Sequence, residues 1–198
     1  PMYHQRKIIE RAEGLPTTKN NQPIFLFDAD NTLGPYDASQ IILKFLGNGT
    51  YERMKKNFKR GYSHYSFLMH HHIHMKAGSR FDECVQGLGS GIKLSDEVVG
   101  CLREAQSKGP VVILTAGIPE VWRIALRAHG LAVGADYSKE IVVHGLVDGD
   151  DGLVMDEQGK ETFARAAKEK GYYVVAAGDS QIDTGMLRVA DAAFVIAR

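Results

Sequence analysis

The stretch IFLFDADNTLGPYD (residues 24–37) opens with an apolar run and closes with acidic and turn-forming residues. The run is too short for a helix and is typical of a strand buried on both faces of a sheet. It ends abruptly at Asp28, and a second carboxylate follows at Asp30. Two carboxylates this close at a strand end repel each other and must be desolvated or neutralised. We therefore expect a cation at this point of the fold.

Three more apolar runs of the same kind follow along the chain, PVVILT (110–115), YYVVAAGD (172–179) and AAFVIA (192–197). Helical patterns lie between the runs, and several of them close on glycine, as helices often do. These patterns span residues 94–109, 118–130, 159–171 and 184–191. Strands that alternate with helices predict an α/β fold with a Rossmann-like, three-layer parallel sheet.

Two stretches interrupt this alternation. Residues 35–92 hold no buried-strand run, only helical segments, which predicts a small helical cap inserted after the first strand. The core would then comprise residues 1–34 and 93–198. The glycines of GLGSG (87–91) predict a flexible linker at one end of this cap. Residues 137–156 alternate short β-type runs with Gly and Asp, which predicts a hairpin.

Polar groups stand at one predicted strand end after another. Thr32 shares the loop after the first strand with Asp28 and Asp30. The later groups are Thr115 and the backbone of Ala116 after the second strand, Lys160 in the helix before the third, and Asp179 and Asp183 after the third. On a parallel sheet these groups converge on one spot. Clustered carboxylates need a hard cation such as Mg²⁺, and a lysine and a threonine beside them suit a phosphate.

The chain resembles the haloacid dehalogenase (HAD) superfamily in four motifs that follow one another in the expected order. They are Asp28-Ala-Asp30-Asn-Thr32, Thr115-Ala-Gly117, Lys160 and Gly178-Asp179-Ser-Gln-Ile-Asp183. The likeness is greatest to the phosphoserine-phosphatase-like branch, whose helical cap lies between the first and second motifs. It covers the core, whereas the cap agrees only in position and helical character. One such motif alone is weak evidence for the superfamily, but four motifs in the expected order, each at the end of a predicted strand or helix, are a specific signal.

This resemblance implies a Mg²⁺-dependent phosphatase that acts on a small phosphorylated metabolite. Asp28 would be the nucleophile that becomes an aspartyl phosphate, and Asp30 would serve as general acid and then general base. Mg²⁺ would be held by Asp28, the backbone carbonyl of Asp30 and Asp179. The remaining members are Thr115, Ala116 and Lys160, which would bind the phosphoryl oxygens, and Asp183 and Thr32, which would lie just outside the metal ligands.

General chemistry supports these roles independently. A carboxylate that attacks a phosphate dianion meets electrostatic repulsion, which a metal ion and Lys160 would offset. A covalent intermediate divides one slow hydrolysis into two easier steps. The general acid must be a carboxyl group distinct from the nucleophile, and Asp30 meets that need two residues past Asp28. Dehalogenases of the superfamily have no acidic residue there, so Asp30 indicates phosphoryl transfer.

Several of these residues also have a purely structural alternative. Lys168 and Lys170 lie near Lys160, and an exposed helix lysine is common. Thr115 fits the N-cap of the helix that follows it. Asp183 fits an acidic residue that faces a helix macrodipole.

The substrate is the feature that the sequence determines least. Phosphoserine phosphatases carry an acidic residue nine positions past the nucleophile, where it helps to bind the amino group, and Asp37 occupies that offset. Asp37 also fits a helix cap. The arginine expected to hold the serine carboxylate is absent from FLMHHHIHM (67–75), so another small phosphomonoester fits as well. For His70 and His74 in this run, contact with substrate is favoured over a metal site, and an ordinary polar role over both.

Composition limits the partners and the location. The formal net charge of +0 argues against a broad electrostatic surface for nucleic acid or a membrane. No apolar run approaches the ~20 residues that span a bilayer. The polar start lacks the apolar centre of a secretory signal, and Cys84 and Cys101 have no metal-like spacing. These features predict a cytoplasmic protein with reduced thiols and leave its oligomeric state open.

Two other functions are compatible with the motifs. A phosphotransferase or phosphomutase of the same fold would pass the aspartyl phosphate to an acceptor other than water, and the sequence barely separates it from a phosphatase. A non-catalytic phosphate-binding protein would keep the fold without turnover, although all four motifs are intact.

Overall fold

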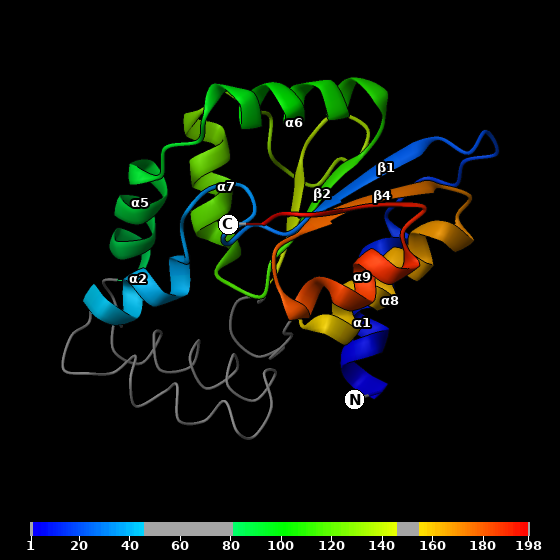
Figure 1. The fold of residues 1–198 in the computed structure, drawn as a ribbon, viewed down its shortest axis with the longest axis horizontal. Helices are drawn as coiled ribbons and strands as arrows, with labels where there is room; N and C mark the ends of the chain where they lie inside the picture. Colours follow the sequence, from blue (N-terminus) through cyan, green and yellow to red (C-terminus); the bar gives the residue numbers. More distant parts are fainter. Residues whose placement is uncertain (1, 46–80, 146–154, 198) are drawn as a thin grey trace.

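A five-stranded sheet forms the centre of the molecule in the computed structural model, which describes residues 2–45, 81–145 and 155–197 (Figure 1). Its strands are β1 (Pro23–Phe27), β2 (Val111–Leu114), β3 (Val142–His144), β4 (Tyr173–Gly178) and β5 (Ala192–Val195). Their order across the sheet is β3-β2-β1-β4-β5, and every neighbouring pair is parallel. The predicted Rossmann-like α/β sheet is confirmed, with all four predicted strands in it. The expectation that each of these strands is buried on both faces is wrong for β5, where Phe194 is 58% and Val195 is 73% exposed at the edge of the sheet.

The fifth strand, β3, comes from the stretch that was expected to form a hairpin. Val142–His144 pairs in parallel with β2 at one edge of the sheet. Its apolar run is short and is followed by Gly145, so the local pattern resembled a turn-rich ribbon more than a buried strand. Residues 146–154, which belong to the same expected hairpin, lie outside the described residues.

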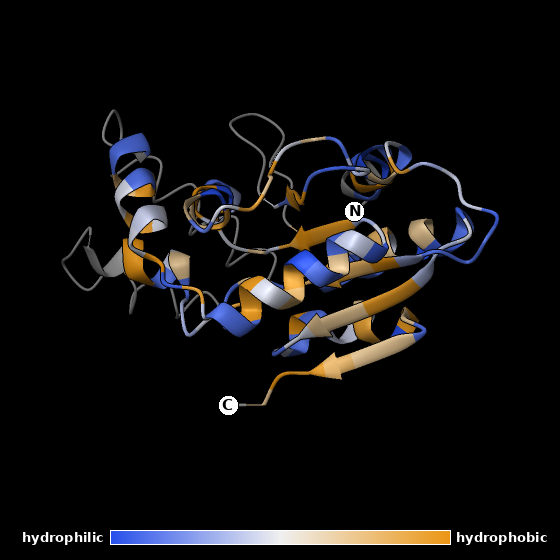
Figure 2. Ribbon diagram, turned by 90° about the horizontal axis from the view of Figure 1, so that it is seen from above, coloured by the Kyte–Doolittle hydropathy of each residue, from blue (hydrophilic) through white to orange (hydrophobic). Residues whose placement is uncertain are grey.

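Helices lie on both faces of the sheet, so that the central strands β1 and β2 and most of β4 lie between two helical layers (Figure 2). One layer contains α1 (Met2–Glu13), α8 (Glu157–Glu169) and α9 (Thr184–Val189), the last preceded by the 3-10 turn η4 (Gln181–Asp183). The other contains α6 (Asp96–Lys108) and α7 (Pro119–Ala128). Helix α5 (Phe81–Gly91) packs against α7, and α2 (Ala38–Phe45) against α5, beside this layer (Figure 1). None of the described helices is both long enough and apolar enough to cross a membrane.

Strand β1 serves both layers because successive side chains point to opposite faces. Ile24 and Leu26 are fully buried in the core beneath α1 and α8, whereas Phe25 and Phe27 pack against the other core. The apolar run before Asp28 is therefore explained by burial on both faces. This burial anchors the strand whose end carries the first acidic motif.

Helix α8 begins at a defined point because Asp156 caps it. The Asp156 side chain accepts a hydrogen bond from the Gly159 backbone N–H at 2.8 Å, as N-cap residues do. This cap places Lys160 in the first turn of α8, on the side of the sheet where β1 and β4 end. The helix start thus positions a basic side chain beneath the acidic motifs.

The proposed cap over residues 35–92 has its described ends in α2 and α5, and residues 46–80, with His70 and His74, lie outside the described part. The expected flexible linker at 87–91 is instead the end of helix α5. Gly89 serves close packing, because a Cβ there would lie 2.7 Å from the Ile124 Cβ of α7. The division into core and cap stays a prediction.

Candidate functional site

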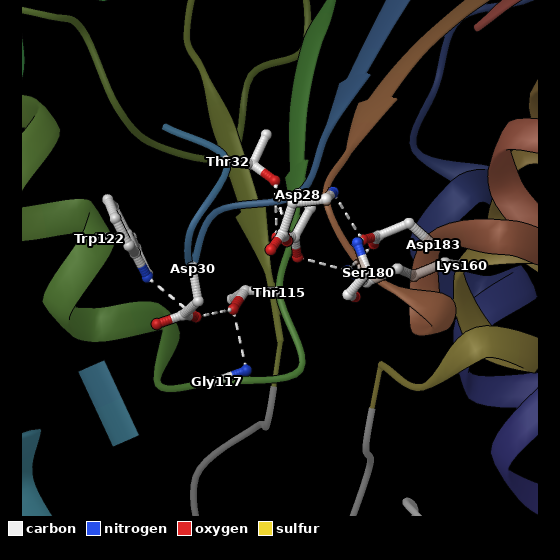
Figure 3. A network of polar contacts seen from close by, with 10 residues as sticks. Asp28, Asp30, Thr32, Thr115, Gly117, Trp122, Lys160, Ser180 and Asp183 are labelled. Carbon is white, nitrogen blue, oxygen red and sulfur yellow. Dashed lines mark hydrogen bonds and ion pairs between the residues drawn. The ribbon is translucent and has the colours of Figure 1, made fainter. Parts of the chain in front are cut away.

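The carboxyl ends of three neighbouring strands place polar side chains at one edge of the sheet (Figure 3). Asp28 directly follows β1, Thr115 follows β2 and Asp179 follows β4. The chain leaves β1 on one side to form β2 and β3, and it returns on the other side as β4. Such a reversal of strand order is a common ligand site in α/β sheets.

A buried lysine lies at the centre of this site. The ammonium group of Lys160 is 2.5 Å from Asp28 Oδ1 and 2.6 Å from Asp183 Oδ1, and its side chain is 1% exposed. Burial alone would lower the pKa of Lys160, but the carboxylates of Asp28 and Asp183 outweigh that effect and raise it. Lys160 therefore stays protonated and supplies part of the positive charge expected between the acidic residues.

The two neighbouring lysines serve the scaffold. Lys168 pairs with Asp191 at 2.7 Å, and Lys170 donates to the backbone carbonyls of Glu13 and Leu15 at the end of α1. Of the three lysines in this part of the sequence, Lys160 is the one that contacts the acidic motifs. The structure thus places Lys160 where the sequence motif expects it.

Asp183 organises the loop after β4. Its Oδ2 accepts hydrogen bonds from the backbone N–H groups of Asp179 and Ser180, at 3.1 and 3.0 Å, and from the Ser180 hydroxyl at 2.9 Å. Its Oδ1 accepts from Lys160. The bond from the Ser180 N–H is half of a capping box for η4, whose other half runs from the Asp183 N–H to the Ser180 side chain, and the bond from Lys160 orients the lysine. Asp183 therefore combines a helix-capping role with a role in the site.

Thr32 lies between two carboxylates. Its Oγ1 is 3.0 Å from Asp28 Oδ2 and 3.4 Å from Asp179 Oδ1, so its one hydroxyl proton is shared between them. Burial raises the pKa of Asp28 to about 7, although Lys160 pulls it back. One ammonium group thus only partly compensates the clustered carboxylates, and a further cation would favour their ionised form.

The donor set fits a hard metal ion. Asp28, Asp179 and Asp183 each bring one carboxylate oxygen within 4.8 Å of the others. Oxygen donors of this kind suit Mg²⁺. Asp183 is completely buried and its oxygens already accept several hydrogen bonds, whereas Asp179 is half-buried at the rim. The residues therefore fit an ion contacted by Asp28 and Asp179, with Asp183 behind them.

Asp30 points away from Lys160 and is enclosed by other groups (Figure 3). Its Oδ1 accepts from the Ala38 backbone N–H at 2.6 Å. Its Oδ2 accepts from the Thr115 hydroxyl at 2.9 Å and from the Trp122 indole N–H at 3.3 Å. The backbone also lies close, since a Cβ at Gly117 would collide with Oδ2. Asp28 and Asp30 therefore occupy different surroundings although they are two residues apart.

The surroundings of Asp30 suit an acid and base. Burial raises the pKa of Asp30 to about 6, and the hydrogen bonds from Ala38, Thr115 and Trp122 limit the increase. A carboxyl group with a pKa near 6 can hold a proton and release it close to neutral pH, as proton transfer in catalysis requires. The sequence predicted Asp30 for this role, and the structure adds burial as the physical cause of its raised pKa.

The three remaining predicted site residues lie in the segments that follow β1 and β2. Thr115 is fully buried, and its hydroxyl donates to Asp30 while accepting from the Gly117 N–H at 2.9 Å. Ala116 is buried in the same loop. Asp37 caps α2 by accepting from the Gln40 N–H at 2.8 Å, as the structural alternative expected. Phosphate or substrate contact by these residues stays a prediction.

Trp122 is the site residue that sequence reasoning missed. It lies in the first half of α7 and is fully buried. In the sequence it reads as one apolar residue on the buried face of an amphipathic helix. Nothing in that periodicity shows where an indole N–H points, so no local signal could have linked it to Asp30.

Comparison with known proteins agrees with this geometry. The family model for haloacid dehalogenase-like hydrolases matches residues 25–188, which include all the site residues described above. No curated protein matches the chain.

Solved structures share the fold at low sequence identity. An analogue of the phospho-aspartyl intermediate of phosphoserine phosphatase has a TM-score of 0.56 at 17% identity, with 89% of this chain and 87% of that chain covered. A substrate-bound phosphoserine phosphatase has a TM-score of 0.54 at 18% identity, with 89% and 86% covered. A HAD-hydrolase of Bacillus subtilis bound to magnesium has a TM-score of 0.50 at 17% identity, with 87% and 86% covered.

Proposed function

The chain belongs to the haloacid dehalogenase-like hydrolases, and we propose that within this family it is a Mg²⁺-dependent phosphatase of a small phosphomonoester. The observation that carries the proposal is that the two carboxyl groups after β1 have different surroundings. Asp28 lies against the buried ammonium group of Lys160, whereas Asp30 accepts hydrogen bonds from other groups and has a pKa raised to about 6. These different surroundings support Asp28 as the nucleophile and Asp30 as the acid.

The proposed reaction has two steps. The Asp28 carboxylate attacks phosphorus, the ester P–O bond breaks, and Asp30 gives its proton to the departing oxygen. The ionised Asp30 then takes a proton from a water molecule, whose oxygen attacks phosphorus of the aspartyl phosphate. This second step releases inorganic phosphate and restores the Asp28 carboxylate and the protonated Asp30. Atoms and charge balance over the cycle.

Lys160 and the loop after β2 are proposed to hold the phosphoryl group. Lys160 is already 2.5 Å from the attacking carboxylate, so its charge lies where negative charge gathers during transfer. Preorganised charge of this kind is usually a large part of catalysis. The Thr115 hydroxyl donates to Asp30 in this structure. We therefore assign phosphoryl binding in this loop to the backbone of Thr115 and Ala116 in addition to the Thr115 side chain.

The metal would be held by Asp28, Asp179 and the backbone carbonyl of Asp30. When bound, Mg²⁺ supplies positive charge that offsets the repulsion between a carboxylate and a phosphate. The support for this ion is the oxygen donor set, together with the magnesium-bound HAD-hydrolase of the same fold.

A panel of small phosphomonoesters, each assayed for released phosphate with and without Mg²⁺, tests the proposal. The phosphoserine phosphatases of similar fold make phosphoserine one member of the panel, but Asp37 caps α2 and the expected arginine is absent from 67–75. Mg²⁺-dependent phosphate release from at least one ester supports a phosphatase. Binding without release would support the non-catalytic alternative.

Removal of divalent metal should abolish turnover. We expect excess chelator to remove activity, Mg²⁺ or Mn²⁺ to restore it, and Ca²⁺ to inhibit because its looser coordination spoils in-line geometry. Phosphate release measured during a metal titration gives the result. Undiminished turnover in chelator would contradict the metal assignment.

Asp30→Asn should separate acid–base catalysis from metal binding. The variant keeps a hydrogen-bond acceptor for the Ala38 N–H and keeps the backbone carbonyl, but it loses the transferable proton. We expect kcat to fall by roughly 10²–10⁴-fold while Mg²⁺ affinity stays near that of the parent protein. Steady-state kinetics and calorimetric Mg²⁺ titration measure the two effects. Loss of Mg²⁺ binding would show that the roles are divided differently.

A further inference from the structure

The Asp30 carboxylate is enclosed by donors from three separate elements. The Ala38 N–H belongs to the start of α2, Thr115 follows β2, and Trp122 lies in α7. Gly117 forms a wall against Oδ2, since a Cβ there would collide with that oxygen. The carboxylate is therefore held from several directions, which restricts its rotation.

The two oxygens of Asp30 are not equivalent in this pocket. Each carboxylate oxygen has two lone pairs. Oδ2 accepts from both the Thr115 hydroxyl, at 2.9 Å, and the Trp122 indole, at 3.3 Å, so both of its lone pairs are used. Oδ1 accepts from the Ala38 N–H at 2.6 Å, and this bond uses one of its two. A proton on the carboxyl group is therefore accommodated on Oδ1.

The two donors to Oδ2 differ in how firmly their direction is fixed. The Thr115 oxygen accepts from the Gly117 N–H at 2.9 Å and donates its own proton to Asp30. The Trp122 nitrogen is a donor only. Trp122 is fully buried, so its ring cannot turn away to hydrogen-bond to bulk water. The Trp122 N–H therefore cannot accept a hydrogen bond from a proton placed on Oδ2, whereas the Thr115 oxygen keeps a second lone pair that could.

We propose that Trp122 is a positioning residue for proton transfer by Asp30, an inference that rests on the general-acid role proposed above. Its indole N–H, with the Thr115 hydroxyl, occupies Oδ2 and leaves Oδ1 to carry the proton to the leaving oxygen. In its absence the carboxyl group can protonate on either oxygen and can rotate, so a smaller fraction is ready to donate. The alternative is a core tryptophan whose N–H is merely satisfied by Asp30.

The leaving group separates these two roles. Dinitrophenolate departs readily without a proton, whereas phenolate is a stronger base and benefits from general acid catalysis. We expect Trp122→Phe to lower kcat for phenyl phosphate by about tenfold or more, the scale of a lost hydrogen bond to a carboxylate. For dinitrophenyl phosphate we expect a loss below about threefold, because that ester needs little acid catalysis.

Trp122→Phe also leaves a smaller ring in the core, so a second replacement must remove the N–H without changing the ring size. Trp122 is the sole tryptophan of the chain, so biosynthetic incorporation of β-(3-benzothienyl)alanine exchanges its N–H for sulfur at this one position. This protein should show the same selective loss as Trp122→Phe. The indole N–H proton resonance gives a readout without turnover: Asp30→Asn should shift it, because an amide replaces the carboxylate acceptor.

Val121→Ala is the matched control, since Val121 neighbours Trp122 on α7 and is equally buried. It should lower Tm and reduce activity on both esters by the same factor, if at all. Selective loss on phenyl phosphate in both Trp122 replacements supports the inference. Equal losses on both esters, or an indole resonance unmoved by Asp30→Asn, would overturn it while leaving the phosphatase assignment intact. If the unaltered protein released phosphate from neither ester, the general-acid premise and the inference would both fail.

Discussion

Asp28→Asn should lower kcat by at least about 10³-fold. The substitution keeps the shape of the side chain but removes the charge that we propose attacks phosphorus. It also removes a proposed metal ligand and the carboxylate that lies 2.5 Å from the Lys160 ammonium group. Asp183 remains 2.6 Å from Lys160, so the lysine keeps one buried counter-charge and the fold should persist. Steady-state phosphate release and Tm, measured on the same preparation, give the result.

Asp191→Asn is the control for this experiment. Asp191 also pairs with a lysine, Lys168 at 2.7 Å, and it accepts from the Val174 N–H of β4, but it lies away from the acidic motifs. We expect its turnover to stay within about twofold of the parent protein, as is usual for substitutions that touch only the scaffold. Near-normal turnover in Asp28→Asn, or an equal loss in both variants, would refute the nucleophile assignment.

Lys160→Met should both abolish turnover and destabilise the metal-free protein. The side chain is 1% exposed and neutralises Asp28 and Asp183, which are themselves buried. Its removal leaves buried carboxylates without their counter-charge, for which a loss of about 3–5 kcal/mol in the free energy of unfolding is typical. Urea denaturation in chelator measures this loss. Lys168→Met, which breaks a partly exposed pair, should cost no more than about 1 kcal/mol.

The pH dependence of this defect follows from the pKa of Asp28. Burial raises that pKa to about 7 even with Lys160 present, and without the lysine it should rise further. A carboxyl group with a raised folded-state pKa stabilises the fold below its unfolded-state pKa and loses that contribution as the pH rises through the folded-state value. The deficit of Lys160→Met should therefore be smaller at about pH 5 than at about pH 8. A loss no larger than that of Lys168→Met at either pH would contradict the buried-charge argument.

The sheet was predictable because its strands are short, uniformly apolar and separated by helical patterns. In β1, β2 and most of β4 those features reflect burial on both faces. The edge strand β5 shares the apolar pattern although Phe194 and Val195 are exposed, so an apolar run alone does not distinguish an edge strand from a central one. The apolar run of β3 (Val142–His144) is too short to predict a strand, and its pairing with β2 depends on the rest of the sheet. The glycines at 87–91 are compatible with either a flexible linker or close helix packing. At Gly89 the close approach of Ile124 on α7 shows that the glycine serves packing, and this tertiary contact cannot be read from the local sequence.

The meeting of Asp28, Lys160 and Asp183 was predictable because parallel strands and the helix before β4 all bring their ends to one edge of the sheet. The hydrogen-bond partners were not. The Thr115 hydroxyl faces Asp30, and Trp122 donates to the same carboxylate from another element. Side-chain periodicity records which face a residue occupies, but it does not record the direction of an O–H or N–H bond.

Trapping of a covalent intermediate tests the central claim most directly. The protein would be mixed with a radiolabelled phosphate ester and Mg²⁺, quenched in acid within a single turnover and digested for peptide mass spectrometry. Borohydride reduction of a parallel sample would mark an acyl phosphate at the modified carboxyl group. We predict label on the peptide that contains Asp28, and none in Asp28→Asn. Phosphate release through many turnovers with no label at Asp28, or with label on another residue, would contradict the proposed mechanism.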